Sequence, residues 1–352
     1  MTIYSELEFT LIRKRMMHFN VLGLSIALID NGNLTLTESF GVTEVGTSNK
    51  VTNSTVFNAC SISKLATTML VMNLVKIGLL ELDQDINDKL VSWKVPENEC
   101  TRHNKVTLRR LLSHQSGIKD PEGSFGECDS NLGIPTMLDL LEGRTAYCPQ
   151  PIQVTNEPGS SFEYSDAGYC LIQQLIEDVS GKSFNSFINE MIFEPLLMKE
   201  STFDLAIPEG EDHRFACGHN KYGDLVKGKY PIYPYPAAAG LWSTSKDLAK
   251  LGIEIIHCLN GSGKLNISQQ IISEMISPQG LSPWSGLGVF LNKSERGLEV
   301  TSLGWGIGYQ CMLVIHPFLG TGGVIMTNSE LGIHQDKGII GEIIRSLNLD
   351  NR

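Results

Sequence analysis

The pattern of apolar and polar positions predicts strands near both ends of the chain and helices in its middle. Residues 5–18 have the periodicity of an amphipathic helix, and 21–30 and 33–42 flank the turn Asp30-Asn31-Gly32 as the strands of a β-hairpin. Toward the C-terminus, an amphipathic helix over 245–260 precedes further strands and a closing helix. Those strands are expected at 286–291, 299–303, 309–317 and 322–328, and the helix at 336–347.

From about residue 90 to 235, helical patterns alternate with loops rich in Pro, Gly and Asn. The helices are expected at 106–117, 134–143, 168–181 and 184–197. Strands at both ends around a helical middle predict an α+β fold, with one antiparallel sheet formed by both chain ends and flanked by helices. We expect a sheet domain from 1–90 and 237–352, and a mainly helical domain from 91–236.

The apolar run 65–82 has almost no polar face, which is typical of a helix in the middle of a domain. Ser61 and Lys64 precede this run, and their spacing sets both side chains on one face of the first turn. Burying a hydroxyl and an ammonium at the start of an apolar helix costs free energy unless the two groups are hydrogen-bonded or have a catalytic role. A Ser needs an adjacent base to become a nucleophile, and a partly desolvated Lys can supply one.

The spacing Ser-x-x-Lys is weak evidence by itself, because it recurs at Ser116/Lys119 and Ser243/Lys246. The first recurrence lies in a polar loop beside a glycine. In the second, Ser243 or Ser245 is expected to cap the helix over 245–260. Position alone therefore leaves two interpretations of Ser61 and Lys64 equally weighted, a catalytic pair or a capping Ser with a surface Lys.

The amino-acid composition argues against some classes of binding partner. The chain has 352 residues, 41% of them hydrophobic and 19% charged, as in an ordinary globular protein, and a net charge of −11. The acidic balance argues against nucleic acid and against an anionic membrane surface as partners. No run reaches the ~18 to 20 apolar residues of a membrane span. The N-terminal pattern is that of a strand and not a leader, so a cytoplasmic location is expected, or a periplasmic or secreted one if the N-terminus is processed.

The eight cysteines are scattered without a Cys-x-x-Cys pair, which is typical of free thiols in a reducing compartment. Cys217 and His219 are the one close pair of metal-ligating side chains, too few for a metal site. We expect no metal and no cofactor.

Five motifs follow one another along the chain, and they are ACSISK, VTLRRLLSHQSG, EYSDAGY, AAAGLWSTSKDLAKL and VIMTNSELG. Together, and in this order, they resemble the class C β-lactamase-related serine hydrolases. This family includes class C β-lactamases, low-molecular-weight penicillin-binding proteins, family VIII carboxylesterases and D-amino-acid peptidases. The resemblance runs from about residue 20 to 345. It implies a β-lactamase/transpeptidase-like fold with the active site in the cleft between the two domains.

The resemblance also implies the catalytic residues. Ser61 would attack a carbonyl carbon and form an acyl-enzyme, with Lys64 as its partner. The family's second motif, Tyr-x-Asn, is matched by Tyr164-Ser165-Asp166, which makes Tyr164 the catalytic tyrosine. Lys64 and Tyr164 would titrate as a coupled pair, and either could be the base. His114 is a weak candidate for a base, because Lys64 already fills that role.

The third motif is matched by Ser302-Leu303-Gly304, followed by Trp305. The backbone N–H groups of Ser61 and Trp305 are expected to form the oxyanion hole. The remaining substrate contacts are expected from Asp166, Ser302, Leu303 and Gly304.

Two departures from the family pattern bear on the substrate. Asp166 puts a carboxylate where an amide is usual, and it could pair with Lys64 and leave Tyr164 as the base. Ser302 replaces the cation or imidazole that helps to bind a substrate carboxylate. We therefore expect a serine hydrolase of small uncharged esters or amides, with β-lactamase or D-amino-acid peptidase activity as the alternative. A catalytically degenerate binding protein is the alternative from another class. The natural substrate and the oligomeric state are not predicted.

Overall fold

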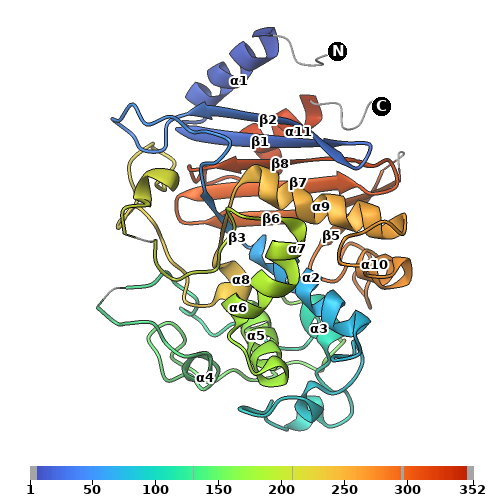
Figure 1. The fold of residues 1–352 in the computed structure, drawn as a ribbon. Helices are drawn as coiled ribbons and strands as arrows, with labels where there is room; N and C mark the ends of the chain where they lie inside the picture. Colours follow the sequence, from blue (N-terminus) through green and yellow to red (C-terminus); the bar gives the residue numbers. More distant parts are fainter. Residues whose placement is uncertain (1–5, 130, 208, 295–296, 347–352) are drawn as a thin grey trace.

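The structure, a computed structural model, describes residues 6–129, 131–207, 209–294 and 297–346. A six-stranded antiparallel sheet has the strand order β2-β1-β8-β7-β6-β5, so N-terminal strands pair directly with C-terminal ones (Figure 1). This confirms the α+β fold with a sheet built from both chain ends. The strands are β1 (Gly23–Asp30), β2 (Asn33–Gly41), β5 (Phe290–Ser294), β6 (Gly297–Gly306), β7 (Tyr309–His316) and β8 (Thr321–Thr327).

The first hairpin forms as its turn sequence predicts. Asp30 pairs with Asn33, and the two residues between them, Asn31 and Gly32, both have positive φ, at 51° and 68°. Asn and Gly tolerate this conformation, and it matches the twist of the flanking strands.

Helices cover both faces of the sheet. The helix α9 (Ser245–Leu259) packs on β1, β2, β7 and β8 from one side. On the other side, apolar residues of α1 (Glu6–His18) and α11 (Ile339–Ser346) share a core with β1, β7 and β8. Because both faces are covered, seven of the eight residues of β1 are buried.

The helix α2 (Ser63–Lys76) runs through the centre of the molecule, and its first twelve residues are all buried. It ends earlier than the predicted run 65–82, since Gly78 turns the chain with φ 73°. A small sheet that the sequence did not predict precedes it, in which β3 (Phe57–Cys60) pairs with β4 (Leu241–Ser243). The remaining helices of the chain's middle lie below the large sheet in Figure 1, and they are α3 (Leu108–Leu112), α4 (Met137–Leu141), α5 (Asp166–Ser180), α6 (Phe184–Ile188), α7 (Glu194–Leu196) and α8 (Pro236–Ala239).

Several predicted boundaries are wrong for identifiable reasons. The helix expected over 106–117 is only α3, because His114 and Gly117 both have positive φ. The strand expected from residue 286 begins at Phe290. The expected cap of α9 at Ser243 or Ser245 is also wrong, since Thr244 is the N-cap and accepts from Asp247 N–H. The remaining short elements are α10 (Gln269–Met275), η1 (Ile86–Asp88), η2 (Glu99–Thr101), η3 (Asn189–Phe193), η4 (Asp212–Arg214) and η5 (Gln335–Lys337).

The division into domains at 1–90, 91–236 and 237–352 stays a prediction. All eight cysteines are free thiols, and most are buried. In the part of the chain that the structure describes, no helix is both long and apolar enough to cross a membrane. The same residues contain no group of three or more His, Cys, Asp or Glu side chains arranged to hold a metal ion.

Candidate active site

Ser61 lies in the sharp turn between β3 and α2. Cys60 has a left-handed backbone with φ 48°, and its N–H donates to the Asn58 side chain at 2.8 Å. The turn is fixed by Ser63, whose hydroxyl donates to the Cys60 carbonyl at 2.5 Å and accepts from Leu241 N–H at 2.9 Å. From residue 55 to 74, Ser61 is the one residue that is not buried. The turn therefore presents a single hydroxyl to the outside of an otherwise closed segment.

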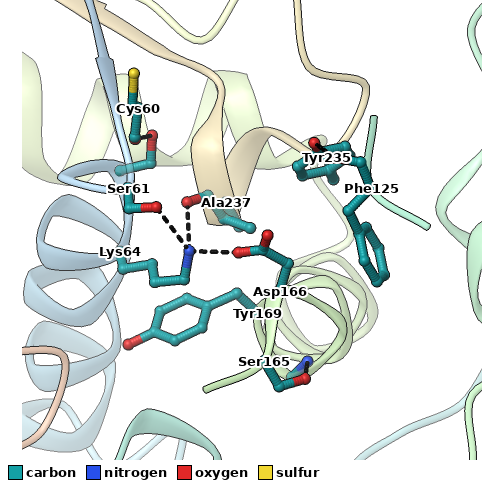
Figure 2. Close-up of polar contacts among 12 residues, drawn as sticks. Cys60, Ser61, Lys64, Phe125, Ser165, Asp166, Tyr169, Tyr235 and Ala237 are labelled. Carbon is teal, nitrogen blue, oxygen red and sulfur yellow. Dashed lines mark hydrogen bonds and ion pairs between the residues drawn. The ribbon is translucent and has the colours of Figure 1, made fainter. Parts of the chain in front are cut away.

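Lys64 is almost completely enclosed, with its side chain 4% exposed. Its ammonium donates to Asp166 Oδ1 at 2.6 Å and to Ser61 Oγ at 3.4 Å (Figure 2). It also donates to the Ala238 carbonyl at 2.9 Å. The contact with Asp166 is the shortest of the three, and it is an ion pair. Burial alone would lower the pKa of Lys64, but the charges of Asp166 and then Tyr164 outweigh it and hold this pKa above its usual value.

Tyr164 immediately precedes the N-cap residue of α5 and lines the same hollow as Ser61 and Lys64. The centre of its ring lies 4.9 Å from Lys64 Nζ. The side chain is 40% exposed, and its ring stacks on His114 with centroids 4.3 Å apart. The structure thus brings the three predicted catalytic residues together from segments far apart in the sequence.

Asp166 begins α5 and turns toward Lys64 (Figure 2), and it is not among the residues that line the hollow. It is supported by Asp120, which accepts from the Asp166 and Ala167 N–H groups at 2.9 and 3.0 Å and from the Ser165 hydroxyl at 2.7 Å. Burial, and then the charge of Asp166, raise the pKa of Asp120. The sequence did not point to Asp120, because its loop carries no motif and its hydrogen-bond partners are 45 to 47 residues away.

The strand β6 passes close to the turn that carries Ser61 because Gly304 and Gly306 have no side chain. A Cβ on Gly304 would lie 2.4 Å from the Ala59 carbonyl oxygen and 2.2 Å from Cys311 Sγ, and one on Gly306 would lie 2.8 Å from Cys60 Sγ. No larger residue fits this approach without displacing the turn. Gly304 therefore sets the distance between the strand and Ser61.

Ser302 and Leu303 on β6 line the hollow, as the third motif predicts. The Trp305 side chain points elsewhere, since its indole N–H donates to Glu330 at 3.2 Å and the ring is 42% exposed. The role of the Trp305 main-chain N–H in an oxyanion hole stays a prediction.

The hollow beside Ser61, here called the Ser61 hollow, is small, with a cavity volume of about 20 Å³. Among the described residues that line it, Lys64 is the one that carries a charge, and this charge is paired with Asp166. His114 also lines it, but burial and the nearby Lys64 charge lower the pKa of His114 to about 3, so the imidazole is neutral. The hollow is therefore close to electrically neutral. Its walls are Ser61, Lys64, Leu112, His114, Tyr164, Ser285, Gly288, Val289, Phe290, Ser302 and Leu303.

This fold and the grouping of Ser, Lys and Tyr define the class of protein. The chain belongs to the Beta-lactamase family, whose profile matches residues 10–343. Members of this family are serine hydrolases that act on esters and amides. The resemblance expected from the five motifs, and the fold it implied, are confirmed.

Two curated relatives illustrate the relationship. The chain is 32% identical over 209 residues to Penicillin-binding protein 4 of Amycolatopsis lactamdurans, which covers 58% of this chain and 50% of that protein. It is 23% identical over 329 residues to Protein flp of Staphylococcus aureus strain MW2, covering 91% of this chain and 62% of that protein. The chain thus spans about half to three fifths of the length of these relatives.

Solved structures agree on the architecture. An octameric penicillin-binding protein homologue from Pyrococcus abyssi is 25% identical, with a TM-score of 0.76 over 97% of this chain and 77% of that one. The D-amino acid amidase from Ochrobactrum anthropi SV3 is 22% identical, with a TM-score of 0.79 over 98% of both chains. The second similarity shows the fold alone.

Proposed function

We propose that this chain hydrolyses small uncharged esters or amides through an acyl-enzyme on Ser61, with the Tyr164 phenolate as general base. The observation that carries this proposal is the ion pair of Lys64 with Asp166, in which Nζ and Oδ1 lie 2.6 Å apart. The paired carboxylate holds Lys64 protonated, so the lysine has no lone pair to receive the Ser61 proton. Lys64 then acts as a fixed positive charge beside Tyr164, with Nζ 4.9 Å from the centre of the ring.

The reaction would proceed in two halves. Tyr164 takes the proton of the Ser61 hydroxyl while Oγ bonds to the substrate carbonyl carbon, and the carbonyl oxygen becomes an oxyanion held by backbone N–H groups of Ser61 and Trp305. The intermediate collapses as the C–O or C–N bond to the leaving group breaks, and Tyr164 returns the proton to that group. Water then attacks the acyl carbon, giving its proton to Tyr164, and the Ser61 hydroxyl is regenerated with the release of the acid.

The charge of the Ser61 hollow supports an uncharged substrate. The single lining cation is neutralised by Asp166, and the third motif supplies Ser302 in place of a cation or imidazole. A substrate carboxylate would lose its hydration here without gaining an opposite charge. We therefore place β-lactams and peptides with a free carboxylate second to neutral esters and amides. A D-amino acid amide has no carboxylate, so it stays within the proposed class.

A phosphonate probe that forms a covalent bond with activated serines tests this function before any substrate is known. We expect a fluorophosphonate to label the wild type on the peptide that contains Ser61, and Ser61→Ala to abolish the labelling. Ser116→Ala and Ser243→Ala are matched controls, since both lie in the same Ser-x-x-Lys spacing, and they should be labelled like the wild type. An unlabelled, folded wild type would favour the alternative of a degenerate binding protein.

A parallel assay then separates the substrate classes. A chromogenic neutral ester, a D-amino acid amide and a chromogenic cephalosporin are compared by kcat/KM. We expect kcat/KM for the ester or the amide to exceed kcat/KM for the cephalosporin, which carries a carboxylate. A cephalosporin preferred over both would contradict the substrate class while leaving the acyl-enzyme chemistry intact.

A further inference from the structure

We propose that His114 is the positioning residue of Tyr164, a neutral imidazole that holds the phenol beside Lys64 without taking or giving a proton itself. The inference rests on the proposed function, because it concerns the same base. His114 follows α3 in the loop motif LLSHQSG, which the catalytic assignment leaves without a role.

Three contacts connect His114 to Tyr164 and to both of its chain neighbours. The N–H of Glu163 donates to the His114 carbonyl at 2.7 Å, and the N–H of Ser165 donates to His114 Nδ1 at 3.1 Å. Between these bonds the imidazole stacks on the Tyr164 ring, with centroids 4.3 Å apart and planes 27° apart. One residue therefore fixes the tyrosine at its main chain on both sides and at its ring.

Such support matters because Tyr164 is exposed. Its side chain is 40% accessible, whereas Tyr169, the next tyrosine on the same segment, is fully buried. An exposed phenol that must act as a base needs its ring fixed, because a displacement of about 1 Å in a catalytic group can cost ~10²-fold in rate. The stacked imidazole supplies that restraint.

The backbone conformation of His114 directs its ring toward Tyr164. Its φ is 57°, in the left-handed region, and the residue is 6% exposed. His, with Asn and Asp, is among the side chains that adopt this conformation more readily than others. The left-handed turn ends α3 and directs the imidazole back toward residues 162 to 165, where it also contacts Phe162.

The ring is neutral because its Nδ1 accepts a hydrogen bond, which leaves the ring proton on Nε2. Protonation would break the bond from Ser165 and add a second cation beside Lys64. Burial and that neighbouring charge lower the pKa of His114 to about 3, so the ring does not titrate in the working range. The other titratable groups around the pair are Lys64 on α2, Asp166 and Tyr169 on α5, Asp120 behind Ser165, and Glu163.

Two substitutions separate the contacts. His114→Asn keeps a side-chain acceptor and tolerates positive φ but removes the stacked ring, while His114→Phe keeps a ring and removes the acceptor. The rate of Ser61 labelling by a fluorophosphonate is measured from pH 5 to 11, together with kcat and KM on a neutral ester. We expect His114→Asn to label ~10- to 100-fold more slowly, with KM within about threefold of wild type.

The pH profile distinguishes positioning from a structural role. A displaced base no longer sets the pH at which Ser61 becomes reactive, so the rising limb of the labelling rate should move in His114→Asn. A loss of folded protein alone would lower labelling at every pH without changing the pH at which the labelling rate rises. His219→Asn is the matched control, since it removes another buried imidazole that accepts a backbone N–H, from Val45 at 3.1 Å, and it should leave the limb in place.

The outcomes are distinct. A folded His114→Asn with the wild-type rate and the wild-type pH limb would overturn the assignment. If His114→Asn does not fold, His114→Gly decides by the same criterion, because Gly accepts positive φ and removes both the ring and the acceptor. A wild type that is not labelled at Ser61 at any pH would instead refute the proposed function.

Discussion

Lys64 and Asp166 form an ion pair at the centre of the candidate site, with Nζ and Oδ1 2.6 Å apart and side chains 4% and 23% exposed. The lysine is thereby held charged, although burial alone would lower its pKa. In this arrangement the Asp166 carboxylate points to Lys64, and Asp166 is not among the residues that line the Ser61 hollow. The protonation state of Lys64 therefore depends on a residue at the start of α5.

Asp166→Asn should change the pH dependence of the reaction. Without the carboxylate, burial dominates and the pKa of Lys64 falls, so the lysine loses its proton as pH rises through a lower value than in the wild type. We expect the alkaline limb of the pH–rate profile to move to lower pH. Where Lys64 stays charged, the variant should be ~3 to 5 kcal/mol less stable in urea unfolding, because one partner of a buried pair is missing. The exposed Asp204→Asn is the control, and an unchanged profile in Asp166→Asn would contradict the assigned role of the pair.

Tyr164→Phe should lower kcat by ~10² to 10⁴-fold with little change in KM, since a general base contributes to the transition state more than to binding. The ring remains, so its stacking on His114 is preserved and the melting temperature should change little. Steady-state kinetics on a neutral ester together with thermal melting check this prediction. A wild-type kcat in Tyr164→Phe would indicate that Lys64, and not Tyr164, is the general base.

Lys64→Ala should be more damaging than Tyr164→Phe in both activity and stability. It leaves Asp166 and the Ala238 carbonyl without their partner and empties a buried position. We expect a loss of several orders of magnitude in kcat and a clear fall in melting temperature. The double variant Lys64→Met/Asp166→Asn, which removes both charges, should recover stability but not activity. Recovered activity would mean that the ammonium has no role in the reaction.

Gly304→Ala should reduce activity through the nucleophile turn. The added methyl would meet the Ala59 carbonyl oxygen at 2.4 Å and Cys311 Sγ at 2.2 Å, so β6 and the turn must move apart. Overpacking of this kind costs about 1 to 3 kcal/mol, and here it also displaces Ser61 from the third motif. The control is Gly126→Ala, where a Cβ would meet nothing within 4 Å. Equal labelling and melting of the two variants would argue against close packing of β6.

His114 should make the protein sensitive to acid. Its folded pKa, about 3, lies below the unfolded value of 6.5, so the unfolded chain binds the proton more readily. This contribution to stability is fully present above pH 6.5 and is lost as pH falls toward 3, by roughly 2 kcal/mol at pH 5. Urea unfolding from pH 4 to 8 should therefore give a steeper loss for the wild type than for His114→Asn. If stability falls with pH equally in both proteins, protonation of the His114 imidazole does not destabilise the folded state.

Local patterns in the sequence predicted the elements that depend on local physics. The hairpin at Asp30-Asn31-Gly32 formed because Asn and Gly accept positive φ, and α2 is buried because its run has no polar face. Predicted boundaries were wrong where a single residue adopts a left-handed backbone, as His114 does after α3. The periodicity of apolar positions does not show where one such residue ends a helix.

The sequence by itself determined the family, the order of its motifs and the identity of the catalytic candidates Ser61, Lys64 and Tyr164. Only the tertiary structure decided what surrounds them, namely the pairing of Lys64 with Asp166, the support of Asp166 by Asp120, and the stacking of His114 on Tyr164. Motifs are short and local, and side-chain chemistry can be recognised in them. Protonation states depend instead on burial and on charges brought from distant segments, and these exist only once the chain has folded.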